Sequence, residues 1–222
     1  MGKWPFLLSF VLACAVLAPG AGLQPPADGR PIRVAVVVTE RATLIDFAGP
    51  WEVFQDVSPP PGQAGFELYT VSDDTRPRTI SAGMKVVPNH SFADAPEPDV
   101  IVIGAQAGSP ATQEWLRRQA RRGPLLMSVC VGVAKLAALG LLDGKDAATH
   151  HDFIGPLGER FPKVRFLRAK RFVQSDDRIL TAGGLTSGID AALHVVERYY
   201  GRAVAQQTAD YMEYGGTGWM AE

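Results

Sequence analysis

One residue in the chain is placed to act as a nucleophile, Cys130. It follows the segment Leu125–Val129, which is apolar apart from Ser128, and is followed by Val131 and Gly132. This is the pattern of a buried strand that turns sharply into a helix. A thiol at a helix N-terminus meets unpaired backbone N–H groups and the positive end of the helix dipole, which lower its pKa. We therefore predict a reactive cysteine with a lowered pKa; the alternative is a small core residue, because free cysteines are often buried.

A carboxylate with an unusual setting is the second candidate. Asp46 lies within Leu44–Pro50, among apolar residues that precede an expected helix. Aspartate at such a position often caps the helix that follows. It also serves as a proton carrier when it reaches a reacting group. The local sequence leaves both roles open.

The backbone around the expected strand ends offers further candidates. The segment Asp99–Gly104 is predicted to be a buried strand, so Asp46, Gly104 and Cys130 all follow the carboxyl ends of strands. In open α/β sheets ligands bind beyond those ends, so we expect the three segments to share one pocket. Backbone N–H groups at Gly104, Ala105 and Val131 are candidates for an oxyanion hole. The alternative is that the glycine is only structural.

Two other motifs are weaker. His150, His151 and Asp152 resemble a ligand cluster, but adjacent residues usually point in different directions, so we predict no metal site and place His150 at the pocket wall or in a structural role. The loop Thr181–Gly188 lacks the lysine of a phosphate-binding P-loop. We expect it to provide tight packing and a polar cap, with Thr186 as a candidate pocket residue. No cofactor is expected.

The order of the expected elements predicts an α/β fold. Strands are expected at Ile32–Val38, Phe66–Val71, Asp99–Gly104, near Leu125–Val129 and at short segments from Arg165 to Thr181, with helices between them and at Thr186–Tyr200 and Arg202–Tyr211. Pro50 is expected in the first turn of a helix that continues to Val57. Alternating strands and helices imply a doubly wound, mostly parallel sheet.

The ends of the chain suggest export. Of 222 residues, 46% are hydrophobic and 20% are charged, which suits one globular domain. Lys3 and the apolar run Trp4–Leu17, too short to span a membrane, predict a signal peptide at residues 1–21. We expect a flexible leader at 22–31, a domain at 32–214, a tail at 215–222, and a periplasmic or secreted protein without a stable membrane anchor. Cleavage would remove Cys14 and leave Cys130 unpaired.

The charge and the length of the chain bear on its partners. The formal net charge is −1, so no basic surface for nucleic acid is indicated. Because the chain ends at Glu222, we expect no DNA-binding domain. We therefore expect a small-molecule substrate and no nucleic acid.

Several of these motifs, in this order, resemble one known family. Those motifs are Leu44–Phe54, Val102–Ala105, Ser128–Gly132, Leu139–Gly144, Ala148–His150 and Ala182–Asp190. They are similar to the ThiJ/PfpI family of the class I glutamine amidotransferase-like superfamily, above all to its isonitrile hydratase-like branch and to the sensor domains of some AraC-type regulators. The resemblance covers residues 32 to 214.

The resemblance implies a flavodoxin-like sandwich, usually a homodimer without metal, with a nucleophilic cysteine at Cys130 partnered by Asp46. It favours a cysteine-dependent hydratase or hydrolase that acts on a small electrophile, such as an isonitrile converted to an N-substituted formamide. Two positions differ from the hydratases: Val131 stands where a threonine is typical, and Ala105 replaces the second glycine of a pair.

Two other functions remain open. The same pocket would serve an exported sensor or binding protein that holds a small molecule, or registers oxidants through Cys130, without turnover. A protein-quality or glyoxalase-like enzyme of the same superfamily generally has a glutamate as the partner of the cysteine, so Asp46 counts against that function.

Overall fold

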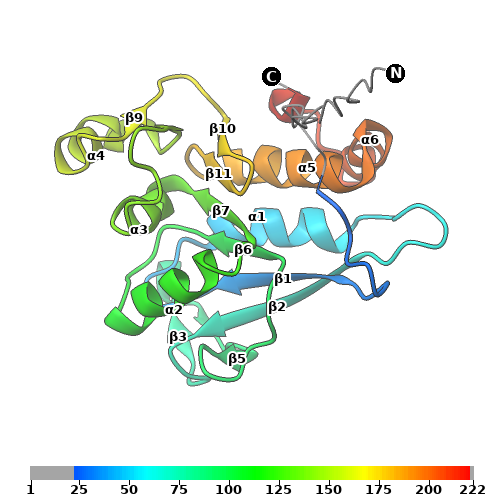
Figure 1. Ribbon diagram of the computed structural model, residues 1–222, viewed down its shortest axis with the longest axis horizontal. Coiled ribbons are helices and arrows are strands. Elements are labelled where there is room, and N and C mark those ends of the chain that lie inside the picture. The colour runs from blue at the N-terminus through cyan, green and yellow to red at the C-terminus, as the bar shows by residue number, and fades with distance from the viewer. Residues whose placement is uncertain (1–22, 221–222) are drawn as a thin grey trace, which may run out of the picture.

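The computed structural model, which describes residues 23–220, is built around one sheet (Figure 1). Every neighbouring pair in it is parallel except the edge pair β10 and β11. The predicted doubly wound, mostly parallel α/β fold is therefore confirmed. The strands in spatial order are β10 (Phe172–Asp176), β11 (Ile179–Ala182), β7 (Leu125–Val129), β6 (Val100–Ile103), β1 (Ile32–Val37), β2 (Phe66–Ser72) and β5 (His90–Ser91).

Helices cover both faces of this sheet, which is why its strands have nearly continuous apolar sequences. One face is covered by α1 (Leu44–Gln55), α5 (Ser187–Tyr200) and α6 (Arg202–Tyr211). The other is covered by α2 (Pro110–Ala120), α3 (Val133–Ala137) and α4 (Ile154–Arg160). Short 3₁₀ turns are η1 (Ser81–Gly83), η2 (Cys130–Gly132), η3 (His151–Phe153) and η4 (Gly218–Met220).

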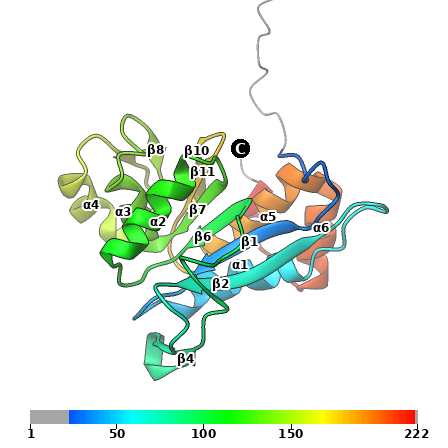
Figure 2. The same ribbon diagram turned by 60° about the horizontal axis from the view of Figure 1, so that its bottom comes forward.

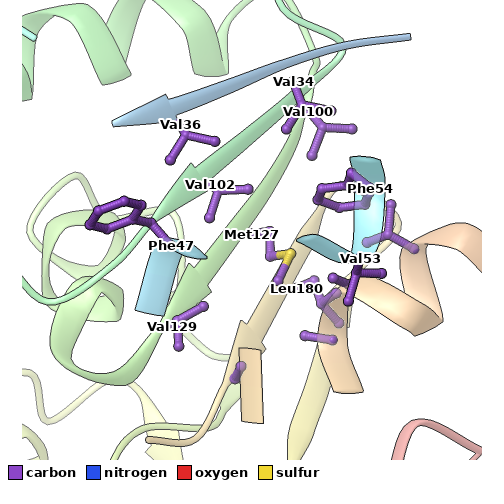
Figure 3. Close-up of a cluster of buried hydrophobic side chains, with 14 of the residues drawn as sticks. Val34, Val36, Phe47, Val53, Phe54, Val100, Val102, Met127, Val129 and Leu180 are labelled. Carbon is purple, nitrogen blue, oxygen red and sulfur yellow. The ribbon is translucent and has the colours of Figure 1, made fainter. Parts of the chain in front are cut away.

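Alternate residues of each strand enter the two cores, as the period of a strand requires. Val34 and Val36 of β1 face α1, whereas Ala35 and Val37 belong to the core under α2 and α3. Figure 3 shows the first of these cores, in which valines from β1, β6 and β7 surround Phe47 and Phe54 of α1. This packing fixes α1 against the sheet and so fixes the position of Asp46.

Two small strand pairs lie outside the main sheet. The pair β3 (Arg78–Thr79) and β4 (Lys85–Val86) is antiparallel and projects from the body of the molecule (Figure 2). The pair β8 (Asp146–Ala147) and β9 (Arg165–Phe166) is parallel. The second pair holds the segment that carries His150.

The first helix begins earlier than predicted. It starts at Leu44, so Pro50 lies inside α1 rather than in its first turn. A proline there removes one backbone hydrogen bond. Its ring lies against α5, where a side-chain carbon added at Gly188 would come within 3.2 Å of Pro50 Cγ. Packing between α1 and α5 therefore overrides the positional preference of proline.

Both ends of the described chain pack against the domain. Leu23 is buried, and both guanidinium amino groups of Arg30 bind Asp99, at 2.6 and 3.0 Å. Trp219 in η4 is also buried, with the Arg202 guanidinium 5.3 Å from its ring centroid. The predicted signal peptide lies outside the described residues. Among residues 23–220, no helix has the length and apolar character needed to cross a membrane.

Candidate functional site

Cys130 lies on a tight turn directly after β7. Its φ of 58° is in the left-handed region, which non-glycine residues seldom adopt. The turn is held because the Cys130 N–H donates to the Gly183 carbonyl at 2.8 Å and the Thr149 hydroxyl donates to the Cys130 carbonyl at 3.1 Å. Gly132 is required as well, since an added Cβ would lie 2.1 Å from the Ile103 carbonyl oxygen. Such strain is typical of functional sites.

Asp46 does not cap its own helix. The N-cap position is Thr43, and Asp46 lies in the first turn of α1, fully buried. Its Oδ2 accepts a hydrogen bond of 2.8 Å from the Ala105 N–H, across the sheet edge at the end of β6. Gly104 permits this approach, because a Cβ there would lie 2.8 Å from the Asp46 Cβ. The capping role is therefore not seen, and the role of Asp46 as a proton carrier stays a prediction.

The Asp46 carboxyl group is held in an environment that disfavours its charge. Burial raises its pKa to about 6, against smaller opposing effects from the N–H groups of Ala105 and Leu185 and from His150. Its Oδ1 has no hydrogen-bond partner among the described residues. A carboxyl group with a pKa near neutrality and with one oxygen free of hydrogen bonds is suited to proton transfer.

The thiol of Cys130 is not activated in the way that we predicted. Burial and the charge of Asp46 raise its pKa to about 11, although the N–H groups of Val131 and Leu185 act in the opposite direction. The predicted lowering of the pKa is therefore wrong: the thiol is only 7% exposed, so burial disfavours the thiolate, and the nearby charge of Asp46 adds to this effect. Cys130 opens only a three-residue 3₁₀ turn followed by the five-residue α3, so it does not lie at the start of a long helix.

Asp46 and Cys130 therefore titrate as a pair. Between pH about 6 and pH about 11 the two groups together hold one proton, which resides mainly on sulfur. In this pH range Asp46 is therefore mainly a carboxylate and Cys130 mainly a thiol.

The backbone N–H groups predicted to form an oxyanion hole have other partners. That of Ala105 donates to Asp46, and that of Val131 stabilises the Cys130 sulfur. In this geometry they stabilise the charged forms of Asp46 and Cys130. The oxyanion role of Gly104, Ala105 and Val131 stays a prediction for a substrate-bound state.

Sequence reasoning missed Leu185. Its N–H stabilises the charged forms of both Asp46 and Cys130, which brings the β11–α5 loop into the site. Leu185 has a φ of 53° and follows Gly183 and Gly184. Gly183 and Gly184 were the only sequence signal of an unusual backbone turn at this position. The contribution of Leu185 comes from its backbone N–H, which its apolar side chain does not indicate.

His150 lies at the wall of the site. A Cβ added at Gly184 would come within 2.2 Å of its ring, so the two residues are in direct contact. Its ring stacks on that of His151 at 4.3 Å, contrary to our expectation that neighbouring side chains diverge, because both residues border the tight turn η3. One donor atom each from His150, His151 and Asp152 lies within 4.8 Å of the others. The expected absence of a metal therefore stays a prediction.

Thr186, a candidate pocket residue, is bonded to an arginine. Its side chain is exposed, and its hydroxyl accepts a hydrogen bond of 3.1 Å from Arg171. Arg171 in turn binds the buried Asp190. Thr186 is thus engaged in the contact between α5 and Arg171, the residue that precedes β10.

The comparisons with known proteins agree with this geometry. Residues 32–198 match the family model described as the DJ-1/PfpI family. The chain belongs to the DJ-1/PfpI family. The resemblance seen in the sequence is therefore confirmed, and so is the flavodoxin-like fold: a ThiJ/PfpI family protein from Pseudomonas syringae superposes with a TM-score of 0.72 at 25% identity, covering 84% of this chain and 76% of the other.

Curated proteins that are similar to this chain differ in function. Isonitrile hydratase from Pseudomonas putida is 31% identical over 192 residues, which are 82% of this chain and 78% of that enzyme. The HTH-type transcriptional regulator GbdR from Pseudomonas aeruginosa is 29% identical over 202 residues, 89% of this chain and 54% of the regulator. The chain spans about half the length of such regulators.

Proposed function

We propose that this protein is a cysteine-dependent hydratase that adds water to a small electrophile, with isonitriles as the substrate class. The observation that carries the proposal is a fully buried carboxylate, Asp46, that acts on a buried thiol, Cys130. Burying a carboxylate without a paired cation costs free energy, and we take this cost as support for a functional role of Asp46. The similarity to isonitrile hydratase supports the choice of substrate.

The first step forms a carbon–sulfur bond. The Asp46 carboxylate takes the thiol proton while sulfur attacks the terminal carbon of the isonitrile, and Asp46 then returns that proton to the same carbon. The product is a thioimidate, R–N=CH–S–Cys130, so atoms and charges balance. Asp46 is suited to both transfers because its pKa of about 6 lies near the operating pH.

The second step releases the product. Water adds its hydroxyl group to the thioimidate carbon and a proton to nitrogen, with Asp46 as the proton carrier. The carbon–sulfur bond then breaks as the hydroxyl proton returns to sulfur. The products are an N-substituted formamide, R–NH–CHO, and the free thiol, and the net reaction consumes one water.

A direct oxidant sensor is a weaker candidate. Oxidation by peroxide requires an exposed thiolate. Cys130 is 7% exposed and its pKa is raised to about 11, so its thiolate fraction at neutral pH is small. In the proposed mechanism the thiol is deprotonated by Asp46 only during its attack on the substrate, and little thiolate is present beforehand.

We also propose that the protein is exported and forms a homodimer. Lys3 with the following apolar run supports a cleaved signal peptide, and the family resemblance supports the dimer. The intact mass of the periplasmic or secreted protein tests the first, and sedimentation velocity tests the second. A mass that includes Met1, or a monomer at micromolar concentration, contradicts the respective statement.

The activity is tested with a panel of aliphatic and aromatic isonitriles. Formation of the N-substituted formamide is followed by NMR for the wild type and for Cys130→Ser, which keeps the size of the side chain but removes the thiol. We expect turnover by the wild type and none above background for the variant. Binding of isonitriles without formamide release identifies a binding protein instead, and equal rates for both proteins reject Cys130 as the nucleophile.

A further inference from the structure

A second binding feature lies beside the thiol, on the face of the sheet covered by α2, α3 and α4. A cavity of about 720 Å³ opens between these helices, which are neighbours in Figure 2. Its volume is within the range of small-molecule pockets, roughly 300–1,000 Å³. Val131 is part of its wall, so the cavity begins one residue from Cys130.

The walls of the cavity are largely apolar. Phe153 is 43% exposed although it is a large aromatic residue. Such exposure is normal for a single residue, but here it borders a concave apolar surface, which is the common form of a ligand site. The apolar wall consists of Val131, Ala134, Ala138, Phe153, Pro156 and Leu157.

A buried cation lies in this apolar setting. Lys135 on α3 is only 9% exposed, and its Nζ donates a hydrogen bond of 2.8 Å to the Gln106 carbonyl. Among the described residues no carboxylate is within ion-pair distance of it. Burial lowers its pKa to about 8. An ammonium group has three N–H donors, and one backbone carbonyl satisfies only one of them.

A second polar group in the cavity also lacks a partner. Gln113 on α2 lines it, and its Oε1 is buried without a hydrogen bond among the described residues. Buried acceptors of this kind are rare in folded proteins unless they face a ligand or a bound water. Gln113 and Lys135 thus provide an acceptor and a donor that the protein itself does not satisfy.

The charge of the cavity has one sign. Lys135 and Arg160 line it, and no acidic residue does so in the described part of the chain. At the rim, Asp73 accepts a 2.5 Å hydrogen bond from the hydroxyl of Ser109, the N-cap residue of α2. Neither Lys135 nor Arg160 has a carboxylate partner among the described residues, and because Arg160 is exposed, Lys135 is the buried cation available to an anion.

We propose that this cavity binds a small organic carboxylate with an apolar body. The carboxylate pairs with Lys135, an N–H or O–H group of the ligand donates to Gln113 Oε1, and the carbon skeleton lies against Phe153 and Leu157. This inference is independent of the hydratase proposal, because none of these contacts involves Cys130 or Asp46.

Matched ligands test the proposal by isothermal titration calorimetry on the full chain. N-acetylphenylalanine has a carboxylate, an amide N–H and an aromatic body, and N-acetylphenylalaninamide differs from it only by lacking the charge. We expect the acid to bind at least about 10-fold more tightly than the amide, because a charge-assisted pair with a buried ammonium is lost. The pair 3-phenylpropanoate and 3-phenylpropanamide repeats the comparison without the N-acetylamino group, so the acid of this pair has no N–H donor.

Three variants assign the contacts. Lys135→Met keeps the length of the side chain, and it should bind acid and amide equally. Lys163→Met is the control, since Lys163 is exposed and paired with Asp143, and it should keep the preference for the acid. Gln113→Leu should weaken N-acetylphenylalanine several-fold and leave 3-phenylpropanoate unchanged.

Several results would overturn the proposal. They are equal affinity of the wild type for acid and amide, an unchanged preference in Lys135→Met, or no saturable binding of either acid at millimolar concentration. Binding is measured in Cys130→Ser as well, where it should equal that of the wild type. A hydratase that fails its own test can therefore still bind the acids, and the reverse holds too.

Discussion

Two buried aspartates, Asp46 and Asp190, show how the same residue type serves different ends in this fold. Both are fully buried in helices that cover the same face of the sheet. Asp190 forms an ion pair with Arg171, whose Nε lies 2.6 Å from Oδ2. Asp46 has no cation in ion-pair contact among the described residues and is bound by the Ala105 N–H.

The two carboxylates differ in whether a cation balances their charge: that of Asp190 is paired with Arg171, and that of Asp46 is not. The charge of Asp190 is balanced, and the pair connects α5 to Arg171, the residue that precedes β10. The charge of Asp46 is not balanced, so burial raises its pKa to about 6 and leaves it able to exchange a proton. Perturbed carboxyl groups of the second kind are typical of active sites.

The largest expected effect is on turnover by Asp46→Asn. Asparagine has nearly the same shape but cannot take the thiol proton, so we predict a loss of on the order of 100-fold or more in isonitrile turnover. Steady-state kinetics beside Asp190→Asn measures it. Near-normal activity in Asp46→Asn would remove this residue from the catalytic site and erase the contrast between the two aspartates.

The same substitution should not destabilise the protein at neutral pH. The folded-state pKa of Asp46 lies above its unfolded value of 3.8, so its contribution to stability is full below pH 3.8 and is lost as pH rises through about 6. At about 1.4 kcal/mol per pKa unit, the charge opposes folding by on the order of 3 kcal/mol above pH 6. Urea denaturation at pH 5 and pH 8 measures this effect. The free energy of unfolding should fall between these pH values in the wild type and should fall less in Asp46→Asn; an equal fall in both proteins would contradict the prediction.

The opposite outcome is predicted for Asp190→Asn. Removal of a fully buried partner leaves Arg171 without its counter-ion, although the 41% exposure of the Arg171 side chain lets water compensate in part. We expect a loss of about 1–3 kcal/mol in the free energy of unfolding, with turnover at 25 °C within a few-fold of the wild type. Equilibrium unfolding and kinetics of one preparation decide it; a stable but inactive variant would assign Asp190 a part in the reaction.

The dependence of rate on pH comes next in size. The base form of Asp46 is required, so kcat/KM should fall about 10-fold per pH unit below pH about 6 and stay level toward pH 10, since the thiol pKa is raised to about 11. Asp190→Asn should leave this profile unchanged. A profile that instead rises with a midpoint near 8.5 would indicate an ordinary free thiol acting without Asp46.

The smallest expected difference concerns the glycine beside each aspartate. In Gly104→Ala the new methyl group would lie 2.8 Å from the Asp46 Cβ, close to the backbone, whereas in Gly218→Ala it would meet Asp190 Oδ1 and Arg171 Cγ, each at 2.9 Å. We expect a loss of stability of about 1–3 kcal/mol in both, and a change in turnover only in Gly104→Ala. Thermal unfolding together with kinetics tests this, and loss of turnover in Gly218→Ala alone would refute it.

Much of the fold could be predicted from local sequence. The apolar runs that became β1, β6 and β7, and the helical segments that became α5 and α6, were recognised because a strand buried on both faces and an amphipathic helix have distinct patterns. Pro50 was misassigned because its place is set by packing against α5, which no local window contains.

Only part of the candidate site could be predicted from the sequence. Cys130 and Asp46 were found as residue types in a suggestive context, but the contribution of Leu185 was missed, because a backbone N–H has no sequence signature. The thiol pKa was predicted in the wrong direction, since burial and the nearness of Asp46 are properties of the folded chain.

By itself, the sequence determined the order of strands and helices, the turn at Cys130 and the glycines that permit it, because these follow from periodicity and from backbone geometry. Only the tertiary structure decided that Asp46 reaches toward β6 instead of capping α1, and that Lys135 is buried beside an unpartnered Gln113. The physical reason is that charge, burial and hydrogen bonding depend on neighbours distant in the chain. Those neighbours meet only when α1, α2 and α3 pack on the sheet.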